Sequence, residues 1–265
     1  MGDARRHPVR GSSPQVSRHT EHNGRMKVRI LTTPLNQIIM KYPRTYHLPY
    51  SPGATKDDKK LGRKTGFLKW FDYYKGQEIV ITEKLDGENT CFTRQDVYAR
   101  SHGAPTRSPW SRNLWDPYDG LYWKVQSKIG SFESMFGENL YGEHSIHYDK
   151  LPCYWFMFAC YWEDCDYWCS WDDVKMSADI LNVPTVPELW RGKITYEEQL
   201  KELVDKYVNE PSLFGPKREG VVIRVTKAFR GDEFPHYVCK WVRPNHVQTD
   251  MYWTKNWKKA ELINI

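Results

Sequence analysis

A lysine placed directly after an alternating apolar run is the first residue of this sequence that could do covalent chemistry. In the stretch ITEKLDGENT, Lys84 follows Glu83, and Asp86 and Asn89 come within the next five positions. A side chain at a strand end can project into a cleft, but a lysine amine becomes a nucleophile only when burial or a nearby cation removes its proton. Taken alone, the ten residues fit either a charged turn or a covalent catalytic lysine.

Residues that could bind one nucleotide occur in separate segments further along the chain. Glu138, Phe158, Glu219 and Lys240 provide, in that order, an acid, an aromatic ring, a second acid and a base. One carboxylate could bind ribose hydroxyls, the ring could stack on a base, the other carboxylate could orient a metal ion, and the lysine could contact phosphate. This chemistry requires elements that bring the four segments to one place.

The elements around these residues are predicted to be mainly strands. Short β-branched or aromatic runs occur in EIVITEKL, NTCFTR, VYARSHG, CYWFMFACYW, EGVVIRVT and HYVCKWV. Apolar spacing predicts a helix in YDGLYWKVQSKIGSFESMF, and capping boxes predict two more helices at Ser170 and Thr195. Because strands and helices do not alternate as regular βαβ units, the pattern predicts an α+β fold.

Two segments lack a clear periodicity but contain aromatic and basic residues together. KYPRTYHLPYSPGATKDDKK, from Lys41, is predicted to be irregular because its Pro and Gly residues exclude a long helix. Its aromatic content is unusual for an idle loop. The terminal stretch MYWTKNWKKAELINI fits either a nucleic-acid contact or a short amphipathic helix that packs on the domain.

Composition favours a folded protein with a polyanionic partner. Of the 265 residues, 40% are hydrophobic and 15% are aromatic, which is enough for a sizeable core. The net charge of +6 is uneven: residues 1–70 contain 15 Lys and Arg against 4 Asp and Glu, and the remainder contains 24 against 29. A basic front on an acidic body predicts one face that binds a polyanion, most commonly nucleic acid.

Cysteine usage and hydropathy exclude some classes. The six cysteines form no CxxC pair, so we expect reduced thiols in an intracellular protein and not a zinc site. No apolar run approaches the length of a membrane helix, and no signal-peptide core is present.

The ordered segments EKLDGEN, ARSHG, GEN, FMF, EGVVIR and CKWVR resemble the collinear motifs of the covalent nucleotidyltransferase superfamily. That superfamily contains ATP-dependent DNA ligases, RNA ligases and mRNA capping enzymes, and the resemblance covers about residues 67–243. The acid before the lysine and the asparagine five positions after it are typical of the RNA ligase branch. KYPRTYHLPYSPG and YGEHSIHYDKLP are also similar to segments of bacterial and phage RNA ligases.

By this resemblance Lys84 is the adenylylated nucleophile, ATP and Mg²⁺ (or Mn²⁺) are the cofactors, and the domain is a nucleotidyltransferase domain of antiparallel sheets with flanking helices (ATP-grasp-like ligase adenylation). The resemblance also implies roles for the other residues. Glu83 would help to recognise the adenine, Phe158 would stack on it (or Phe156 if the register slips by two), and Glu138 would bind the ribose. Asn89 and Arg100 would contact the reacting phosphates or the bound strand, Lys240 would orient the α-phosphate, and Asp86 and Glu219 would bind the metal ion.

Some features depart from the family pattern. The last motif usually has two lysines one residue apart, whereas only Lys240 is present here, and Arg243 could substitute. Gly-Glu occurs twice, and the spacing to Phe158 favours Glu138 over Glu143 as the ribose ligand. Only 22 residues follow Arg243, so we expect no OB-fold domain after the last motif.

The predicted function is that of an ATP-dependent RNA ligase that joins 3′-OH and 5′-phosphate ends through lysyl-AMP and a 5′-adenylylated strand. Alternatives are an ATP-dependent DNA or mixed polynucleotide ligase, a capping-type guanylyltransferase, and a catalytically dead RNA-binding module. The expected partners are RNA ends, with DNA 5′ ends as an option, and a separate end-healing kinase or phosphatase; no membrane is expected.

The predicted organisation has two parts. Residues 1–28 are rich in Arg, His, Ser, Gly and Pro and are expected to be a disordered basic leader or tag-like segment. Residues 29–265 are expected to form the ligase adenylyltransferase domain, with its motif-bearing core at about 67–243. The expected location is the cytoplasm of a bacterium or of a phage-infected bacterium.

Overall fold

Two β-sheets dominate the computed structural model, which describes residues 40–62, 69–100, 103–131, 133–244 and 256–263. The first sheet has the strand order β1-β11-β9-β2-β8, with β1 parallel to β11 and the other neighbours antiparallel. Its strands are β1 (Tyr46–His47), β2 (Glu78–Lys84), β8 (Glu188–Lys193), β9 (Gly220–Val225) and β11 (Val238–Val242). The predicted leader, residues 1–28, lies outside the described residues.

The second sheet is antiparallel throughout and has the order β10-β7-β6-β5-β3-β4. Its strands are β3 (Glu88–Phe92), β4 (Val97–Ala99), β5 (Glu133–Asn139), β6 (Trp155–Trp162), β7 (Tyr167–Trp168) and β10 (Phe229–Arg230). β2 and β3 belong to different sheets although three residues separate them, so the chain passes from one sheet to the other directly after Lys84.

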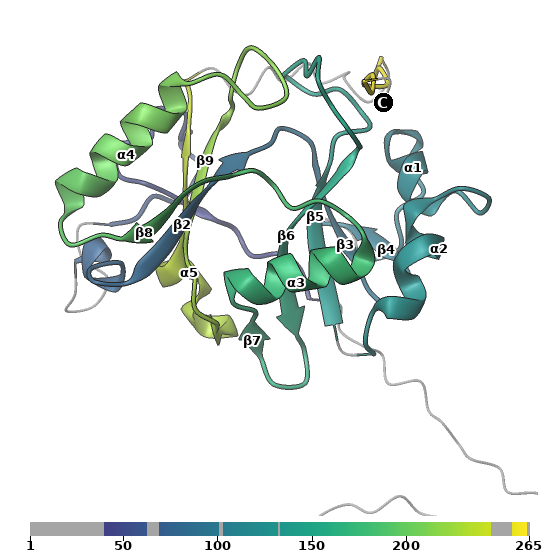
Figure 1. The fold of residues 1–265 in the computed structure, drawn as a ribbon, viewed down its shortest axis with the longest axis horizontal. Coiled ribbons are helices and arrows are strands. Elements are labelled where there is room, and N and C mark those ends of the chain that lie inside the picture. The colour runs from purple at the N-terminus through teal and green to yellow at the C-terminus, as the bar shows by residue number, and fades with distance from the viewer. Residues whose placement is uncertain (1–39, 63–68, 101–102, 132, 245–255, 264–265) are drawn as a thin grey trace, which may run out of the picture. The chain divides into compact units, whose positions relative to one another are not determined.

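Helices flank the sheets, as Figure 1 shows for α3 and α4. α3 (Trp171–Leu181) packs against β6, and α4 (Glu197–Asn209) packs against β9. The shorter helices are α1 (Arg112–Trp115), α2 (Leu121–Val125) and α5 (Phe234–Tyr237). The predicted α+β class, with antiparallel sheets and flanking helices, is therefore confirmed.

The cores are consistent with the strand patterns in the sequence. In β2, Ile79 and Ile81 belong to one buried hydrophobic cluster and Val80 belongs to the other. Alternation along this strand therefore buries both of its faces, as expected for a central strand. Phe158 of β6 packs against both clusters, so its ring lies where the two cores meet.

The helix predicted over YDGLYWKVQSKIGSFESMF is only partly correct. The helix α2 ends at Val125, a 3₁₀ turn follows at Gln126–Lys128, and the residues from Glu133 onward form β5. Pairing of β5 with both β3 and β6 explains the difference, because two long-range ladders outweigh a local helical pattern.

One of the two predicted capping boxes is present. At the start of α3, Ser170 accepts a hydrogen bond from the amide of Asp173, and the Asp173 carboxylate accepts one from the amide of Ser170. The box predicted at Thr195 is wrong, because α4 begins one residue later with Tyr196 at its N-cap. The amide of Thr195 donates instead to the side chain of Gln199, at 3.1 Å.

The expectation that all cysteines are reduced is also wrong. Cys160 and Cys169 form a disulfide, with Cα atoms 5.5 Å apart. Because Tyr161 pairs with Trp168 in the β6–β7 hairpin, these cysteines occupy the next cross-strand position. The remaining cysteines, Cys91, Cys153, Cys165 and Cys239, are free.

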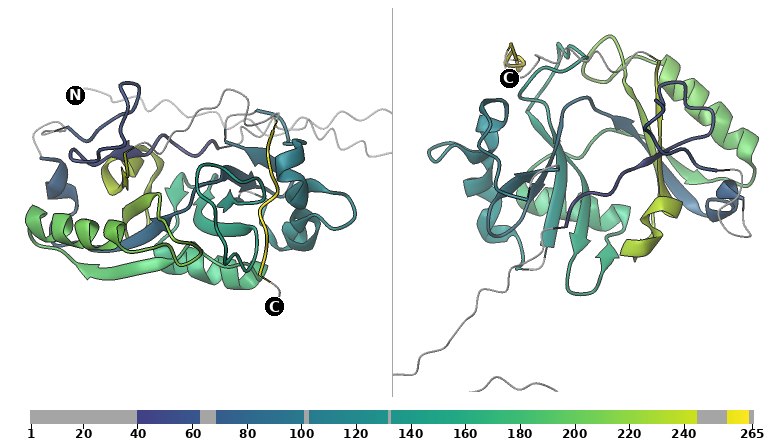
Figure 2. Two further views of the ribbon diagram at one scale, coloured as in Figure 1. Left: turned by 90° about the horizontal axis from the view of Figure 1, so that it is seen from above. Right: turned by 180° about the vertical axis from the view of Figure 1, so that it is seen from behind.

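The segment KYPRTYHLPYSPGATKDDKK, from Lys41, contacts both sheets. Tyr46 and His47 pair with β11 of the first sheet, whereas the ring of Tyr42 contacts Phe136 and Phe158 of the second sheet. The right-hand view of Figure 2, which looks from behind, shows this dark purple segment crossing in front of the sheets. The segment is irregular, as predicted, apart from the two residues of β1.

The described part of the terminal stretch, residues 256–263, lies along the domain without forming a helix. Lys259 forms a bridge with Gly142, and Leu262 forms one with Leu151. The remainder of MYWTKNWKKAELINI lies outside the described residues. Within the ranges that the structure describes, the helices are all too short or too polar to cross a membrane.

Candidate active site

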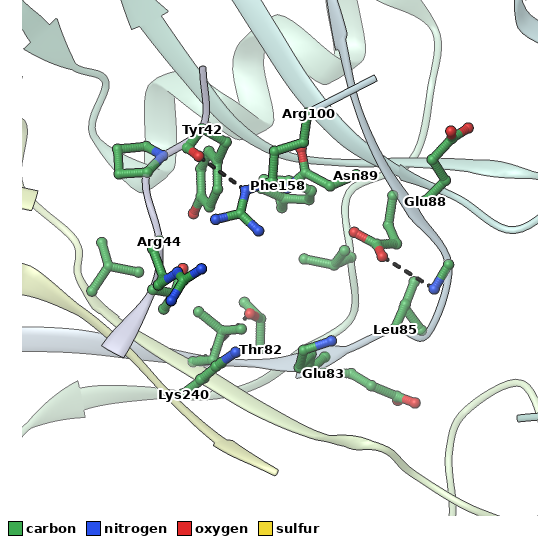
Figure 3. Close-up of a pocket in the computed structure, with 18 of the residues that line it drawn as sticks. Tyr42, Arg44, Thr82, Glu83, Leu85, Glu88, Asn89, Arg100, Phe158 and Lys240 are labelled. Atoms are coloured by element: carbon green, nitrogen blue, oxygen red, sulfur yellow. Dashed lines mark hydrogen bonds between the residues drawn. The ribbon is translucent and has the colours of Figure 1, made fainter. Parts of the chain in front are cut away.

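A cavity of about 560 Å³ lies between the two sheets and contains most of the predicted site residues. Its walls come from both sheets, from residues 42–45 and from the start of α3. Figure 3 shows Tyr42, Arg44, Arg100, Phe158 and Lys240 around this cavity. Seven of the predicted site residues line it: Glu83, Lys84, Asn89, Arg100, Glu138, Phe158 and Lys240.

Lys84 is the last residue of β2, where its amine meets a carboxylate. The register of β2 and β9 pairs Lys84 with Gly220, which brings the preceding residue, Glu219, beside it. The Lys84 Nζ and Glu219 Oε2 atoms are 2.5 Å apart, and the two side chains are 24% and 4% exposed. The amine is therefore held in a fixed position at the cavity wall.

The charges around Lys84 are strongly coupled. Burial alone would lower the pKa of Lys84, but Glu219, Glu138 and Asp86 outweigh burial and raise this pKa above its ordinary value. Burial raises the pKa of Glu138 to about 8 and that of Glu219 to about 6, against the attraction of Lys84. Near neutral pH, a protonated Lys84 thus faces an ionised Glu219 and a largely neutral Glu138.

Glu138 and Asn89 reach the cavity from neighbouring strands of the second sheet. The two residues pair directly across β3 and β5, so both side chains lie on one face. Glu138 Oε1 accepts a hydrogen bond from the amide of Gly87 at 3.1 Å, which is drawn as a dashed line in Figure 3. The Asn89 Oδ1 atom is buried and has no hydrogen-bond partner among the described residues, as expected of a group that awaits a ligand.

The structure distinguishes the two pairs of alternatives in this region. Phe158 lines the cavity, whereas Phe156 does not, is 1% exposed and packs against Phe214. Likewise Glu138 lines the cavity, whereas Glu143 lies outside it and pairs with an exposed histidine. Both placements agree with the preferred residues, Phe158 from the motif match and Glu138 from its spacing to Phe158.

Lys240 is the cation that β11 contributes to the cavity. Burial, and then the charge of Lys84, lower the pKa of Lys240 to about 8. Arg243, which the sequence offered as a second cation of this motif, does not line the cavity. The other neighbour from this strand is Val238, which is apolar.

Two predicted residues use their carboxylates elsewhere. Glu83 Oε2 lies 3.4 Å from Arg218 Nε, in an ion pair that is almost fully buried. Asp86 does not line the cavity, and its Oδ2 atom accepts hydrogen bonds from the Ser145 amide, the Ser145 hydroxyl and the Ile146 amide at 2.6–2.9 Å. Asp86 therefore anchors the loop after β5 to the turn that follows Lys84.

A preformed metal cage is not found in the described part of the chain, where no three His, Cys, Asp or Glu side chains are grouped to hold a metal ion. Glu219 and Glu138 lie near Lys84, and the Asp86 Oδ1 atom accepts no hydrogen bond from the described residues. Mg²⁺ is commonly held by one or two carboxylates together with substrate phosphates and water. The donor set fits that mode of binding.

Several cavity residues were not predicted from the sequence as site residues. They are Tyr42, Arg44, His144 and Arg224. Tyr42 and Arg44 belong to the KYPRTYHLPYSPG segment, whose unusual aromatic and basic content was the available signal. His144 and Arg224 belong to YGEHSIHYDKLP and EGVVIR, two segments that carried the resemblance, but neither residue was assigned a role there.

A sequence model of the RNA ligase family matches residues 77–242, which is more than half of the chain. The chain therefore belongs to the RNA ligase family. No curated protein is similar enough in sequence to count as a match.

Solved structures of ligases are similar to part of the chain. A lysine-to-alanine variant of a Naegleria gruberi RNA ligase with ATP and Mn is 18% identical with a TM-score of 0.49, and the match covers 65% of this chain and 52% of that one. For an archaeal ATP-dependent RNA ligase the values are 13%, 0.48, 77% and 48%. For a putative ATP-dependent DNA ligase from Aquifex aeolicus they are 18%, 0.47, 77% and 50%. The chain thus matches about half the length of each of these proteins.

Proposed function

We propose that this protein is an ATP-dependent RNA ligase that joins a 3′-OH end to a 5′-phosphate end through a lysyl-AMP intermediate. The observation that carries the proposal is the placement of the Lys84 amine. It lies at the wall of a cavity that also presents an aromatic ring, Phe158, and a half-buried cation, Lys240. These are the groups needed to hold a base and a phosphate on either side of a nucleophile.

Each of the other residues binds a different part of the nucleotide. Phe158 stacks on the adenine, and Glu138 accepts hydrogen bonds from the ribose hydroxyls. Lys240 orients the α-phosphate. Asn89 and Arg100 contact the reacting phosphates or the bound strand. Glu83 helps to recognise the adenine, since its Oε1 atom is buried without a hydrogen-bond partner among the described residues.

Lys84 must lose a proton before it can attack. Burial favours the neutral amine, and the carboxylates of Glu219, Glu138 and Asp86 oppose this. A divalent cation bound by Glu219 and Asp86 would supply positive charge that cancels their attraction for the ammonium group. Burial of the Lys84 side chain would then favour the neutral amine, which is the nucleophilic form.

The reaction then proceeds in three steps, two transfers of the adenylyl group followed by a phosphoryl transfer that seals the strands. The Lys84 nitrogen forms a bond to the α-phosphorus of ATP, and the bond to the β-phosphate oxygen breaks, which releases pyrophosphate. An oxygen of the RNA 5′-phosphate attacks the same phosphorus and displaces Lys84. Finally the 3′-OH attacks the 5′-phosphate of the activated strand and expels AMP, with its proton passing to solvent or a nearby base. Ends of other chemistry would first require an end-healing kinase or phosphatase. We place the reaction in the cytoplasm, where both ATP and RNA ends are present.

The first experiment is adduct formation with α-labelled ATP. We expect wild-type protein to become covalently labelled and Lys84→Ala to retain no label, because the nitrogen that forms the bond is gone. Lys193→Ala, a change of the same kind at an exposed position of β8, should label normally. Label on the Lys84→Ala protein would show that the nucleophile has been misassigned.

A panel of substrates separates the alternatives. A capping-type guanylyltransferase would prefer GTP in the adduct assay, and a DNA or mixed ligase would seal nicked DNA as well as RNA. A catalytically dead RNA-binding module would bind RNA in a salt-sensitive manner without any adduct. Our proposal requires an adduct with ATP and sealing of RNA ends.

A further inference from the structure

Three cationic side chains from three separate segments point into the open side of the cavity. Arg44 comes from the irregular segment before β1, Arg100 follows β4, and Lys240 belongs to β11. Figure 3 shows the three directed towards the same space, with Arg44 across the cavity from the strand end that carries Glu83 and Leu85. Within the described residues, none of the three forms an ion pair with a carboxylate.

The two arginines are held by backbone carbonyls, which fix them without neutralising their charge. Arg44 Nη1 donates to the Asp57 carbonyl oxygen at 2.8 Å, and Arg100 Nε donates to the Tyr42 carbonyl oxygen at 3.1 Å. Each guanidinium keeps further N–H donors for a ligand. The segment from residue 42 to residue 57 is thus both the source of Arg44 and a support for Arg100.

Carboxylates at the same side of the cavity do not cancel this charge. Asp57 and Asp58 also line the cavity. The Asp58 Oδ2 atom accepts hydrogen bonds from the amide and hydroxyl of Thr55, and its Oδ1 atom lies 3.6 Å from His47 Nε2. The three cations outnumber Asp57 and Asp58, so this side of the cavity is suited to a ligand with several negative charges.

The acidic side of the cavity dictates how a triphosphate must lie. Lys84 is surrounded by Glu219, Glu138 and Asp86, so only the phosphate under attack can approach it. Phosphoryl transfer requires the leaving group roughly in line with the nucleophile and on its far side. Arg44 occupies the side of the cavity opposite the end of β2, which is where a leaving pyrophosphate would emerge.

We propose that Arg44 binds the β- and γ-phosphates of ATP and the pyrophosphate that leaves. The inference rests on the function proposed above. When the Lys84 nitrogen bonds to the α-phosphorus and the bond to the bridging oxygen breaks, the electron pair remains on the pyrophosphate. The planar guanidinium of Arg44 can donate two hydrogen bonds to that developing charge, and Arg100 and Lys240 complete the set of cations.

The test compares a step that uses the β- and γ-phosphates with one that does not. In Arg44→Gln we expect the ATP concentration for half-maximal adduct formation to rise about 10-fold to 100-fold, the range for loss of a charged hydrogen bond. The pyrophosphate concentration that discharges the adduct should rise by a similar factor. Sealing of a chemically prepared 5′-adenylylated RNA strand, which has no β- or γ-phosphate, should stay within about twofold.

The choice of variants separates binding from folding. Glutamine at position 44 removes the charge but keeps a polar amide, and an unchanged Tm of the variant would show that loss of the hydrogen bond to the Asp57 carbonyl leaves the fold intact. Arg230→Gln is the matched control, because Arg230 is an exposed arginine of β10 that pairs with Asp232 outside the cavity. An unchanged ATP dependence in Arg44→Gln would overturn the proposal. Equal losses with ATP and with the adenylylated strand would also overturn it.

Calorimetric titration with pyrophosphate gives a readout that needs no catalysis. We expect wild-type protein to bind pyrophosphate at least about 10-fold more tightly than Arg44→Gln. Equal affinities would reject the role of Arg44 even if the protein proved not to be a ligase. Absence of an adduct on wild-type protein would instead reject the proposed function, so the two failures can be told apart.

Discussion

Lys84 and Glu138 show how single residues in this site carry charge states that differ from those in water. Lys84 keeps its proton because acidic groups, Glu219 foremost, surround it, and Glu138 keeps its own proton because burial disfavours its ionised form. Neither protonation state suits catalysis, which needs a neutral Lys84 amine. Both suit a resting site in which a nucleotide and its cation complete the charge balance.

The raised pKa of Glu138 implies that this residue lowers the stability of the free protein at neutral pH. Its pKa changes from 4.5 when unfolded to about 8 when folded. Below pH 4.5 both states hold the proton, and between pH 4.5 and 8 only the folded state does, so the contribution of Glu138 to stability declines as the pH rises through this window. We therefore expect Glu138→Gln to gain stability relative to wild type, by about 2 °C or more in Tm at pH 8 and by almost nothing at pH 4.5.

Thermal unfolding without nucleotide at several pH values would measure this effect. The glutamine can still accept the hydrogen bond from the Gly87 amide, so the turn is retained. Glu202→Gln, the same change at an exposed position of α4 outside the cavity, should give no gain that grows between pH 4.5 and 8. A Tm difference for Glu138→Gln that is constant with pH would contradict the assignment of burial as the cause.

At the scale of elements, the turn between β2 and β3 positions the nucleophile. Gly87 in this turn does not have a positive φ, so a left-handed backbone is not the reason for a glycine here. A Cβ at this position would collide with the carbonyl oxygen of Asn139 and lie 2.7 Å from Leu140 Cδ2. The glycine therefore allows the turn after Lys84 to pack closely on the end of β5.

We expect Gly87→Ala to move this turn away from β5 and to misplace both Lys84 and the Gly87 amide that contacts Glu138. Adduct formation should fall at least about 10-fold, because an error of about 1 Å in a catalytic group costs more than this. The free energy of unfolding should fall by about 1–3 kcal/mol. Quantitative adduct kinetics and denaturant titration would provide these two values.

Gly103→Ala is the control, since a Cβ at Gly103 would meet nothing within 4 Å. This variant should retain wild-type stability and adduct formation. If Gly87→Ala also behaved as wild type, close packing against Asn139 could not be what fixes the position of Lys84.

The elements also show what the sequence could and could not predict. The strands β2, β9 and β11 were predicted because their apolar residues recur within each short segment. β5 was missed because Met135 and Phe136 continue the helical spacing of α2, and only pairing with β3 and β6, which are distant in sequence, makes this segment a strand. Local periodicity contains no information about such pairing.

The site shows the same division between local and distant information. The types and order of Lys84, Glu138, Glu219 and Lys240 could be taken from the sequence, because each is part of a short motif. Arg44 could not be predicted as a cavity residue, because its position depends on the pairing of β1 with β11 and on a hydrogen bond to the carbonyl of Asp57. The orphaned Oδ1 atom of Asn89 likewise becomes apparent only once the fold shows that it is buried.

At the scale of the whole molecule, the cavity depends on two cores at once. Lys84, Glu219 and Lys240 come from the first sheet or its borders, whereas Asn89, Glu138 and Phe158 come from the second. Phe158 touches both hydrophobic clusters, so a base stacked on its ring would rest on the junction between the two cores. Nucleotide binding and the mutual position of the sheets are therefore physically linked.

Charge is the other property of the whole molecule that bears on function. The first 70 residues hold an excess of positive charge over an otherwise acidic chain, and an RNA ligase must hold a polyanion. We expect Arg5, Arg6 and Arg10, replaced together by Gln, to weaken RNA binding and to reduce the slope of log affinity against log salt. The reduction should be up to about 0.7 for each single-strand phosphate that the variant no longer neutralises. Fluorescence titrations of a labelled RNA from about 50 to 200 mM salt would measure this slope.

Replacing Lys193, Lys201 and Lys206 on β8 and α4 by Gln removes the same charge from exposed positions of the acidic part and should change the slope less. Equal slopes for the two triple variants would mean that net charge alone, and not the basic first segment, attracts the RNA.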